Sequence, residues 1–103
     1  MRLLVLFDLP TGNSEERRSY SQFRKFLLKD GDIMEQYSVY TRVVLSRDAA
    51  ETHVKRLRAN LPLAGSVTVI TLTERQYESR QILVNTIHVR SQIDVGSQLT
   101  LIL

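Results

Sequence analysis

The chain has 103 residues, a net charge of +3 and no cysteine. Its length suits one domain, and the lack of cysteine excludes disulfides, thiolate metal sites and thiol nucleophiles. No apolar stretch approaches the ~20 residues that cross a bilayer, and the first residues lack a signal-peptide cleavage pattern. We therefore expect a cytoplasmic protein with no membrane partner. The mild basic excess permits a polyanionic partner without requiring one.

The N-terminal third predicts a buried strand followed by a helix. The continuous apolar run of residues 3–7 is typical of a central strand that is buried on both faces. Turn-forming residues follow, Ser14 can cap a helix, and Gly31 is placed to end it. The apolar side of that helix consists of Tyr20, Phe23 and Leu27.

The rest of the chain predicts four more segments of regular structure before a polar stretch. Period-two alternation from 33 to 45 favours strand structure, with Tyr37 and Tyr40 on opposite faces. Asp48 with Glu51 resembles a capping box for a second helix. Strands are then expected at about 66–73 and 77–84. Together these predict an α+β, ferredoxin-like βαββαβ sandwich over residues 1–84, followed by a tail at 85–103.

The extreme C-terminus is unusually apolar. Residues 99–103 read Leu-Thr-Leu-Ile-Leu, which would promote aggregation if it were exposed. We predict that this segment pairs as an extra edge strand, on its own sheet or on a partner's.

The expected sheet has one face without helices, and that face predicts a dimer. Both helices pack on one side in this arrangement, yet the strands at 3–7 and 66–73 are apolar on both sides. Monomers rarely expose large apolar patches, so we expect a homodimer through this sheet face. The alternative is that the C-terminal tail folds back over it.

Asp8 is the candidate metal ligand and catalytic residue. It ends the first strand beside a loop, where a carboxylate can bind Mg²⁺ that takes its other ligands from water and phosphate. Two copies of Asp8 in a symmetric dimer could share one ion. Alternatively, Asp8 only organises the turn, since Asp is a common turn residue. The two histidines, His53 and His88, lack a visible partner and are expected at the surface.

The first helix also predicts a basic outer ridge. At ~100° per residue, Arg18 and Lys25 fall opposite the apolar side, with Arg17 beside them near the helix N-terminus. Backbone N–H groups there favour phosphate, so the ridge indicates contact with a nucleic-acid backbone. An ordinary solvated helix face is the alternative.

Several segments in order carry a resemblance to one family. They are Leu3–Phe7 followed by Asp8-Leu9-Pro10, Phe23-Arg24-Lys25-Phe26-Leu27, Gln36-Tyr37-Ser38-Val39-Tyr40 with Arg42, Gly65-Ser66-Val67, and Thr73-Glu74-Arg75-Gln76-Tyr77. Over residues 1–83 the chain resembles the CRISPR-associated Cas2 family, and it is most similar to members that accompany type II systems.

The resemblance implies a ferredoxin-like homodimer that acts on nucleic acid. Members of the family are metal-dependent endoribonucleases, some cut duplex DNA, and they form the scaffold between Cas1 integrase dimers during spacer capture. It implies that Asp8 is the metal-binding aspartate. The basic candidates for nucleic-acid binding are Arg17, Arg18, Arg24 and Lys25. Leu99, Leu101 and Leu103 of the last strand are then candidates for partner binding.

Three functions therefore remain open from the sequence. The favoured one is a scaffold that holds duplex DNA for the integrase, because one carboxylate without an evident general base disfavours a strong nuclease. The second is an active Mg²⁺-dependent endonuclease that cuts single-stranded RNA or duplex DNA and uses Asp8 as its metal ligand. A regulatory small-ligand dimer on the same fold is the third.

Overall fold

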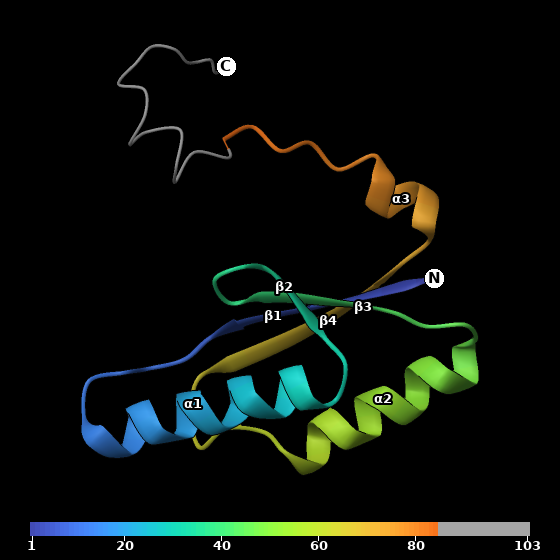
Figure 1. The fold of residues 1–103 in the computed structure, drawn as a ribbon. Helices are drawn as coiled ribbons and strands as arrows, with labels where there is room; N and C mark the ends of the chain where they lie inside the picture. The colour runs from blue at the N-terminus through green and yellow to red at the C-terminus, as the bar shows by residue number, and fades with distance from the viewer. Residues whose placement is uncertain (85–103) are drawn as a thin grey trace.

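The computed structural model describes residues 1–84, which form a four-stranded sheet with three helices. The elements are β1 (Arg2–Asp8), α1 (Ser14–Lys29), β2 (Ile33–Gln36), β3 (Val39–Val43), α2 (Arg47–Ala59), β4 (Ser66–Leu72) and α3 (Glu74–Glu78). All strand pairs are antiparallel, in the order β2-β3-β1-β4. Helices α1 and α2 cover one face of the sheet, and α3 lies on the other side (Figure 1). The predicted α+β, ferredoxin-like fold is confirmed; the tail at 85–103, with the predicted last strand and His88, lies outside the described residues.

The alternating stretch at 33–45 is a hairpin of two strands, β2 and β3. The turn between them holds Ser38 at a positive φ of 68°. The carbonyl of Ser38 accepts a hydrogen bond from the N–H of Phe7 at 3.0 Å. This hairpin supplies the second and third strands of the βαββαβ order, so β4 is the fourth.

The strand predicted at 77–84 is wrong, because a helix begins at residue 74. Thr73 and Gln76 form a capping box: the N–H of Gln76 donates to the Thr73 hydroxyl at 3.0 Å, and the N–H of Thr73 donates to the Gln76 side chain at 2.9 Å. These bonds satisfy the first donors of α3 and favour a helical turn over an extended chain. Residues 79–84 follow α3 without forming a strand.

Both long helices begin at other caps than the sequence predicts. The side chain of Asn13, not Ser14, caps α1 by accepting the N–H of Glu16 at 2.8 Å. Ser46 caps α2, so Asp48 lies in its first turn and does not cap it. In both helices the residue directly before the first helical residue has an extended backbone, which is the conformation that an N-cap requires.

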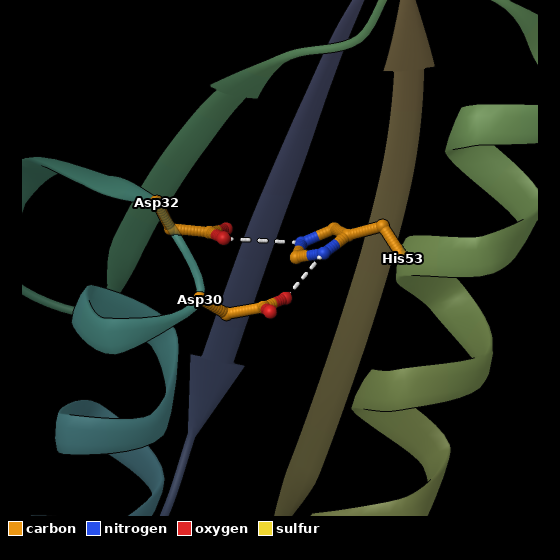
Figure 2. A group of neighbouring side chains, drawn as sticks. All are labelled: Asp30, Asp32 and His53. Carbon is orange, nitrogen blue, oxygen red and sulfur yellow. Dashed lines mark ion pairs between the residues drawn. The ribbon is translucent and has the colours of Figure 1, made fainter.

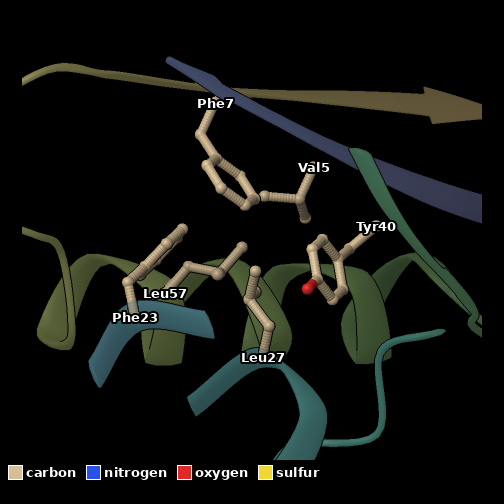
Figure 3. Close-up of a cluster of buried hydrophobic side chains, with 6 residues drawn as sticks. All are labelled: Val5, Phe7, Phe23, Leu27, Tyr40 and Leu57. Carbon is tan, nitrogen blue, oxygen red and sulfur yellow. The ribbon is translucent and has the colours of Figure 1, made fainter. Parts of the chain in front are cut away.

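The main core lies between the sheet and the two long helices. Val5 and Phe7 of β1 meet side chains from α1, α2 and β3 there (Figure 3). The rings of Phe7 and Phe23 pack edge to face with centroids 5.2 Å apart. Burying each such side chain stabilises the fold by roughly 1.5–3 kcal/mol. The predicted apolar side of α1 and the core position of Tyr40 are both confirmed.

The opposite face of the sheet is apolar but only partly open. Leu4 pairs in register with Thr41 and Ile70, which places all three on this face. Ile70 is 42% exposed. The expectation of a face without helices needs correction, because α3 lies over part of it. The contact is made by Tyr77, whose ring stacks on the guanidinium of Arg2 at 4.0 Å.

Candidate functional site

Asp8 is exposed at the end of β1, as the sequence predicts. Its Cα partner is Ser66, the first residue of β4. The chain approaches closely just before that residue: a Cβ on Gly65 would lie 2.5 Å from the Asp8 carbonyl oxygen. Gly65 also has a φ of +103°, so only glycine fits there without strain. The backbone around Asp8 is therefore fixed while its carboxylate stays open to solvent.

The four basic candidates of α1 are all exposed, and two of them lie near Asp8 in the fold. Arg17 and Arg18 fall in the first turns of α1, at the end of the molecule where β1 also ends (Figure 1). Arg17 donates to the carbonyl of Thr11 at 3.3 Å, which holds it against the loop that follows Asp8. Arg24 and Lys25 lie farther along the same helix.

A buried cluster that the sequence did not predict joins the end of α1 to α2. His53 was expected at the surface, but it is fully buried between two carboxylates (Figure 2). Its Nδ1 lies 2.7 Å from Asp30 and its Nε2 lies 3.0 Å from Asp32. Neither pair is aligned as a hydrogen bond, so each is a close contact between a ring nitrogen and a carboxylate.

The end of α1 explains how both carboxylates reach His53. Gly31 ends the helix at a φ of +103°, which confirms its predicted role. The N–H groups of Asp30 and Asp32 donate to the carbonyls of Phe26 and Leu27, each at 2.9 Å. Asp30 and Asp32 therefore flank a fixed turn, and both point toward α2.

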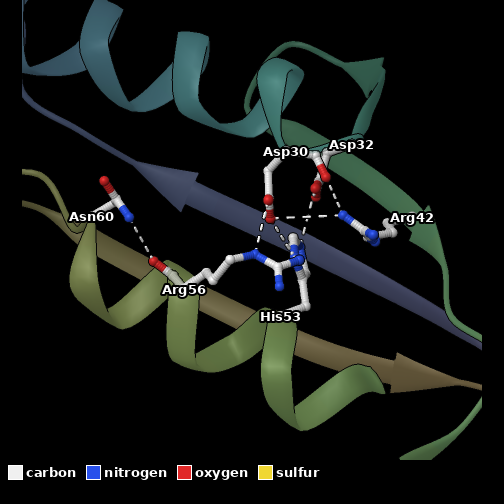
Figure 4. Close-up of polar contacts among 6 residues, drawn as sticks. All are labelled: Asp30, Asp32, Arg42, His53, Arg56 and Asn60. Carbon is white, nitrogen blue, oxygen red and sulfur yellow. Dashed lines mark hydrogen bonds and ion pairs between the residues drawn. The ribbon is translucent and has the colours of Figure 1, made fainter. Parts of the chain in front are cut away.

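Two arginines complete this group around Asp30 (Figure 4). Nε of Arg56 donates to a carboxylate oxygen of Asp30 at 2.9 Å, and Arg42 donates to the Asp30 carbonyl. The guanidinium of Arg42 also lies 3.7 Å from the Asp30 carboxylate. We call this group, formed by Asp30, Asp32, Arg42, His53 and Arg56, the His53 cluster. Its two carboxylates already face three cationic or protonatable side chains.

Ligand atoms of Asp30, Asp32 and His53 lie within 4.8 Å of one another, so these residues could hold a metal ion. Imidazole is a ligand for zinc and other transition metals, whereas Mg²⁺ prefers oxygen ligands and water. A divalent ion there would also compete with the guanidinium groups at Asp30. The chemistry of this cluster therefore differs from that expected for Mg²⁺ at Asp8.

A signal for the buried histidine was present in the sequence. His53 lies three residues after Ala50 and four before Leu57, which puts it on the buried stripe of α2. Asp30 and Asp32 flank the glycine that ends α1. A histidine on the apolar side of one helix and two acids at the end of its neighbour indicate a buried ion pair.

A second group of charges holds α3 on the other side of the sheet. The ring of Tyr77 lies between the guanidinium groups of Arg2 and Arg80, at 4.0 and 3.7 Å. Its hydroxyl donates to Glu35 of β2. Arg2 binds Glu74 through two hydrogen bonds, at 3.0 and 2.7 Å. We call Arg2, Glu35, Glu74, Tyr77 and Arg80 the Tyr77 cluster.

The contacts within the Tyr77 cluster shift the pKa values of three of its side chains. Burial, and then the hydrogen bond to Glu35, raise the pKa of the Tyr77 phenol. The hydrogen bond from Arg2 lowers the pKa of the Glu74 carboxyl, and the same bond raises the pKa of Arg2.

A cleft formed by the described residues lies elsewhere. It has a volume of about 580 Å³ and is formed by α2, Met1 and Thr71 of β4. It contains neither Asp8 nor the basic residues of α1. Within residues 1–84, no helix has the length and apolar character needed to cross a membrane.

Comparison with known proteins finds one family throughout. Residues 1–80 match the family described as CRISPR associated protein Cas2. The chain is 54% identical over 84 residues to a CRISPR-associated endoribonuclease Cas2 of Acidovorax ebreus, which covers 82% of each chain. It is 45% identical over 85 residues to the protein of the same name from Streptococcus mutans, covering 82% of this chain and 77% of the relative.

A solved structure supports the same fold. The crystal structure of Streptococcus pyogenes Cas2 at pH 6.5 matches with a TM-score of 0.64 and 20% identity, covering 82% of this chain and all of that one.

Proposed function

Because the chain belongs to the CRISPR-associated Cas2 family, we propose that it is a dimeric nucleic-acid-binding scaffold that serves the Cas1 integrase in spacer acquisition. The observation that carries this proposal is the exposed basic side of α1 at the same end of the molecule as the exposed carboxylate of Asp8. Binding to phosphate needs only such positive charge, whereas efficient hydrolysis usually needs several acidic ligands.

The basic side of α1 suits the backbone of duplex DNA. Arg17 and Arg18 lie at the start of the helix, and Arg24 and Lys25 lie about two turns farther on. At 1.5 Å per residue, this distance of roughly 10 Å spans more than one phosphate of a strand. Arginine binds phosphate through two parallel hydrogen bonds, and backbone contacts of this kind hold DNA without reading its sequence.

The apolar face of the sheet supports a homodimer. Leu4, Leu6 and Ile70 share this face, and α3 leaves part of it open. A second copy would cover that part and place the Asp8 residues of both copies in one symmetric assembly. Sedimentation velocity at micromolar concentration tests this step directly, and a monomer would remove it.

Asp8 can serve as the one protein ligand that this chain supplies to Mg²⁺ at this site. Its carboxylate is exposed at a strand end, so water and phosphate oxygens can complete the coordination of an ion. When bound, Mg²⁺ would offset charge on a phosphodiester. In this proposal Asp8 holds that ion, and Arg17 and Arg18 hold the neighbouring phosphates.

A metal-dependent endonuclease that acts on single-stranded RNA or duplex DNA is the second candidate. The curated relatives carry the name endoribonuclease, which favours this reading. Among the described residues, however, Asp8 belongs to no group of three or more metal-ligating side chains. Activity at this site would therefore be weak unless the partner copy or the substrate completes it.

An Asp8→Asn variant separates the two functions. It removes the charge that binds Mg²⁺ while keeping the size of the side chain. We expect spacer acquisition with the integrase to continue and any Mg²⁺-dependent cleavage of RNA by highly purified protein to be lost. Glu51→Gln, an exposed acid on α2, is the matched control. Loss of acquisition in Asp8→Asn alone would overturn the scaffold and favour the enzyme.

The basic side of α1 is tested in the same complex. Replacing Arg17 and Arg18 with alanine should weaken DNA binding and reduce the slope of log K against log salt concentration by about 2 per copy. Lys55→Ala with Arg58→Ala removes the same charge from α2 and is the control. Equal effects of the two pairs would show that net charge, not the α1 surface, binds DNA.

A further inference from the structure

Tyr37 is an aromatic side chain held out into solvent at the tip of the β2–β3 hairpin. It is 79% exposed, whereas Tyr40, three residues later, is buried in the core. The hairpin tip lies at the end of the sheet where β1 ends and α1 begins (Figure 1). This is the end that also carries Asp8. An exposed tyrosine offers a large rigid surface that the monomer's own packing does not use.

The turn that carries Tyr37 is fixed to β1. Ser38 adopts a positive φ of 68°, a conformation that non-glycine residues rarely take and that often marks functional sites. Its carbonyl binds the N–H of Phe7 at 3.0 Å. This bond continues the β1–β3 register one step past the pair of Leu6 with Val39. Tyr37 is the turn residue next to Ser38, so it lies at the same end of the sheet as Asp8.

We infer that Tyr37 binds an unpaired base of a single-stranded nucleic acid by stacking, with the adjoining phosphodiester beside Asp8. The inference rests on the proposed nucleic-acid function and names the form of the substrate at this site. In a duplex the faces of the bases are covered by their neighbours, so a protein ring can stack only on a base that is unpaired or at an end. If the protein is a scaffold, the duplex that it holds then has a single-stranded end at this site. If it is a nuclease, its substrate there is a single strand.

Charge near the same end agrees with this arrangement. Arg17 is held against the loop after Asp8 by its hydrogen bond to Thr11. Arg17 therefore supplies positive charge for a phosphate backbone at the end of the molecule that carries Tyr37 and Asp8. Stacking does not distinguish RNA from DNA, because both present the same faces of their bases.

A single-tryptophan variant reports stacking directly. The chain has no tryptophan, so Tyr37→Trp places the only one at the hairpin tip. Leu45→Trp, at a position that is 95% exposed beyond the other end of β3, is the matched control. We expect single-stranded oligonucleotides to quench the fluorescence of Trp in Tyr37→Trp but not in Leu45→Trp. Covalently closed circular duplex, which has neither an unpaired base nor an end, should leave both unchanged. RNA and DNA strands, tested separately, show which one binds more tightly.

Affinity measurements separate stacking from a structural role. Tyr37→Ala should weaken single-strand binding about tenfold, since one stacked base contributes on that order, while Tyr37→Phe should bind like the parent. The oligomeric state of Tyr37→Ala should equal that of the parent. An unchanged affinity in Tyr37→Ala, equal quenching in the two tryptophan variants, or loss of the dimer in Tyr37→Ala would each overturn the inference.

The two proposals fail in different ways. If single strands bind without quenching Trp in Tyr37→Trp, nucleic-acid binding stands and the stacking role of Tyr37 is wrong. If the strands quench it but neither acquisition nor cleavage occurs, the stacking role stands and the proposed function is wrong.

Discussion

The His53 cluster and the Tyr77 cluster use the same kinds of side chain on opposite sides of one sheet. In the first, His53 and the side chain of Asp32 are fully buried between α1 and α2. In the second, Glu74 and Arg80 keep about two-fifths of their side-chain surface exposed. Breaking a buried ion pair leaves a charge without water, whereas an exposed partner regains its hydration. We therefore expect the first cluster to stabilise the whole fold and the second to hold only α3 in place.

The largest effect is expected for His53→Ala. Removing the ring leaves Asp32 buried without its partner, which should lower the free energy of unfolding by about 3–5 kcal/mol. Urea unfolding followed by circular dichroism measures this change. Lys55→Ala, an exposed residue on the same helix, should change stability by less than about 0.5 kcal/mol. A His53→Ala protein as stable as the Lys55→Ala protein would remove the distinction between the two clusters.

A smaller and local effect is expected for Tyr77→Ala. The variant loses two contacts between the ring and guanidinium groups and the hydrogen bond to Glu35, together worth about 2–3 kcal/mol. Amide exchange should become faster in α3 but not in β1 or α1. Tyr77→Phe keeps the ring and should recover most of the protection. Faster exchange throughout the sheet would show that α3 is part of the main folding unit.

The smallest effect is the pH dependence of the Tyr77 cluster. The pKa of Tyr77 is raised in the folded protein, so its contribution is complete below the ordinary tyrosine pKa and is lost as the pH rises through the higher folded value. Glu74 has a lowered pKa, so its contribution is present above the ordinary glutamate pKa and is lost as the pH falls through the lower value.

Ultraviolet titration measures the tyrosine part of this prediction. The chain has four tyrosines, and one of them should ionise late in the folded protein. That late step should be missing in Tyr77→Phe. If all the phenols of the parent titrate together, burial and the hydrogen bond to Glu35 do not raise the pKa of Tyr77.

The two clusters also differ in how far the sequence predicts them. The periodic apolar residues of β1, α1 and α2 predicted the main core, because burial imposes a spacing that can be read directly. The contact of His53 with Asp30 and Asp32 depends on how α2 lies against the end of α1, which spacing within one helix cannot give. The residues after β4 were predicted to form a strand at 77–84, but the capping box of Thr73 and Gln76 begins a helix there instead.

The candidate site was predicted in part. Asp8 and the basic residues of α1 are exposed as expected, and the end of β1 and the start of α1 do meet at one end of the molecule (Figure 1). The position of Tyr37 beside that end depends on a turn at Ser38 with positive φ, for which serine gives no signal. The alternating pattern of side chains alone predicted one continuous strand through this turn.

The order of the strands has a consequence for how the chain is made. The central strand β1 is synthesised first, but its neighbours β3 and β4 begin 37 and 64 residues later. At about 5–20 residues per second, the ribosome needs roughly 3 to 13 s to reach β4 after β1. During that time at least one edge of the chain's most apolar strand has no partner. Newborn protein should therefore depend on holding chaperones more than the small size of the domain suggests.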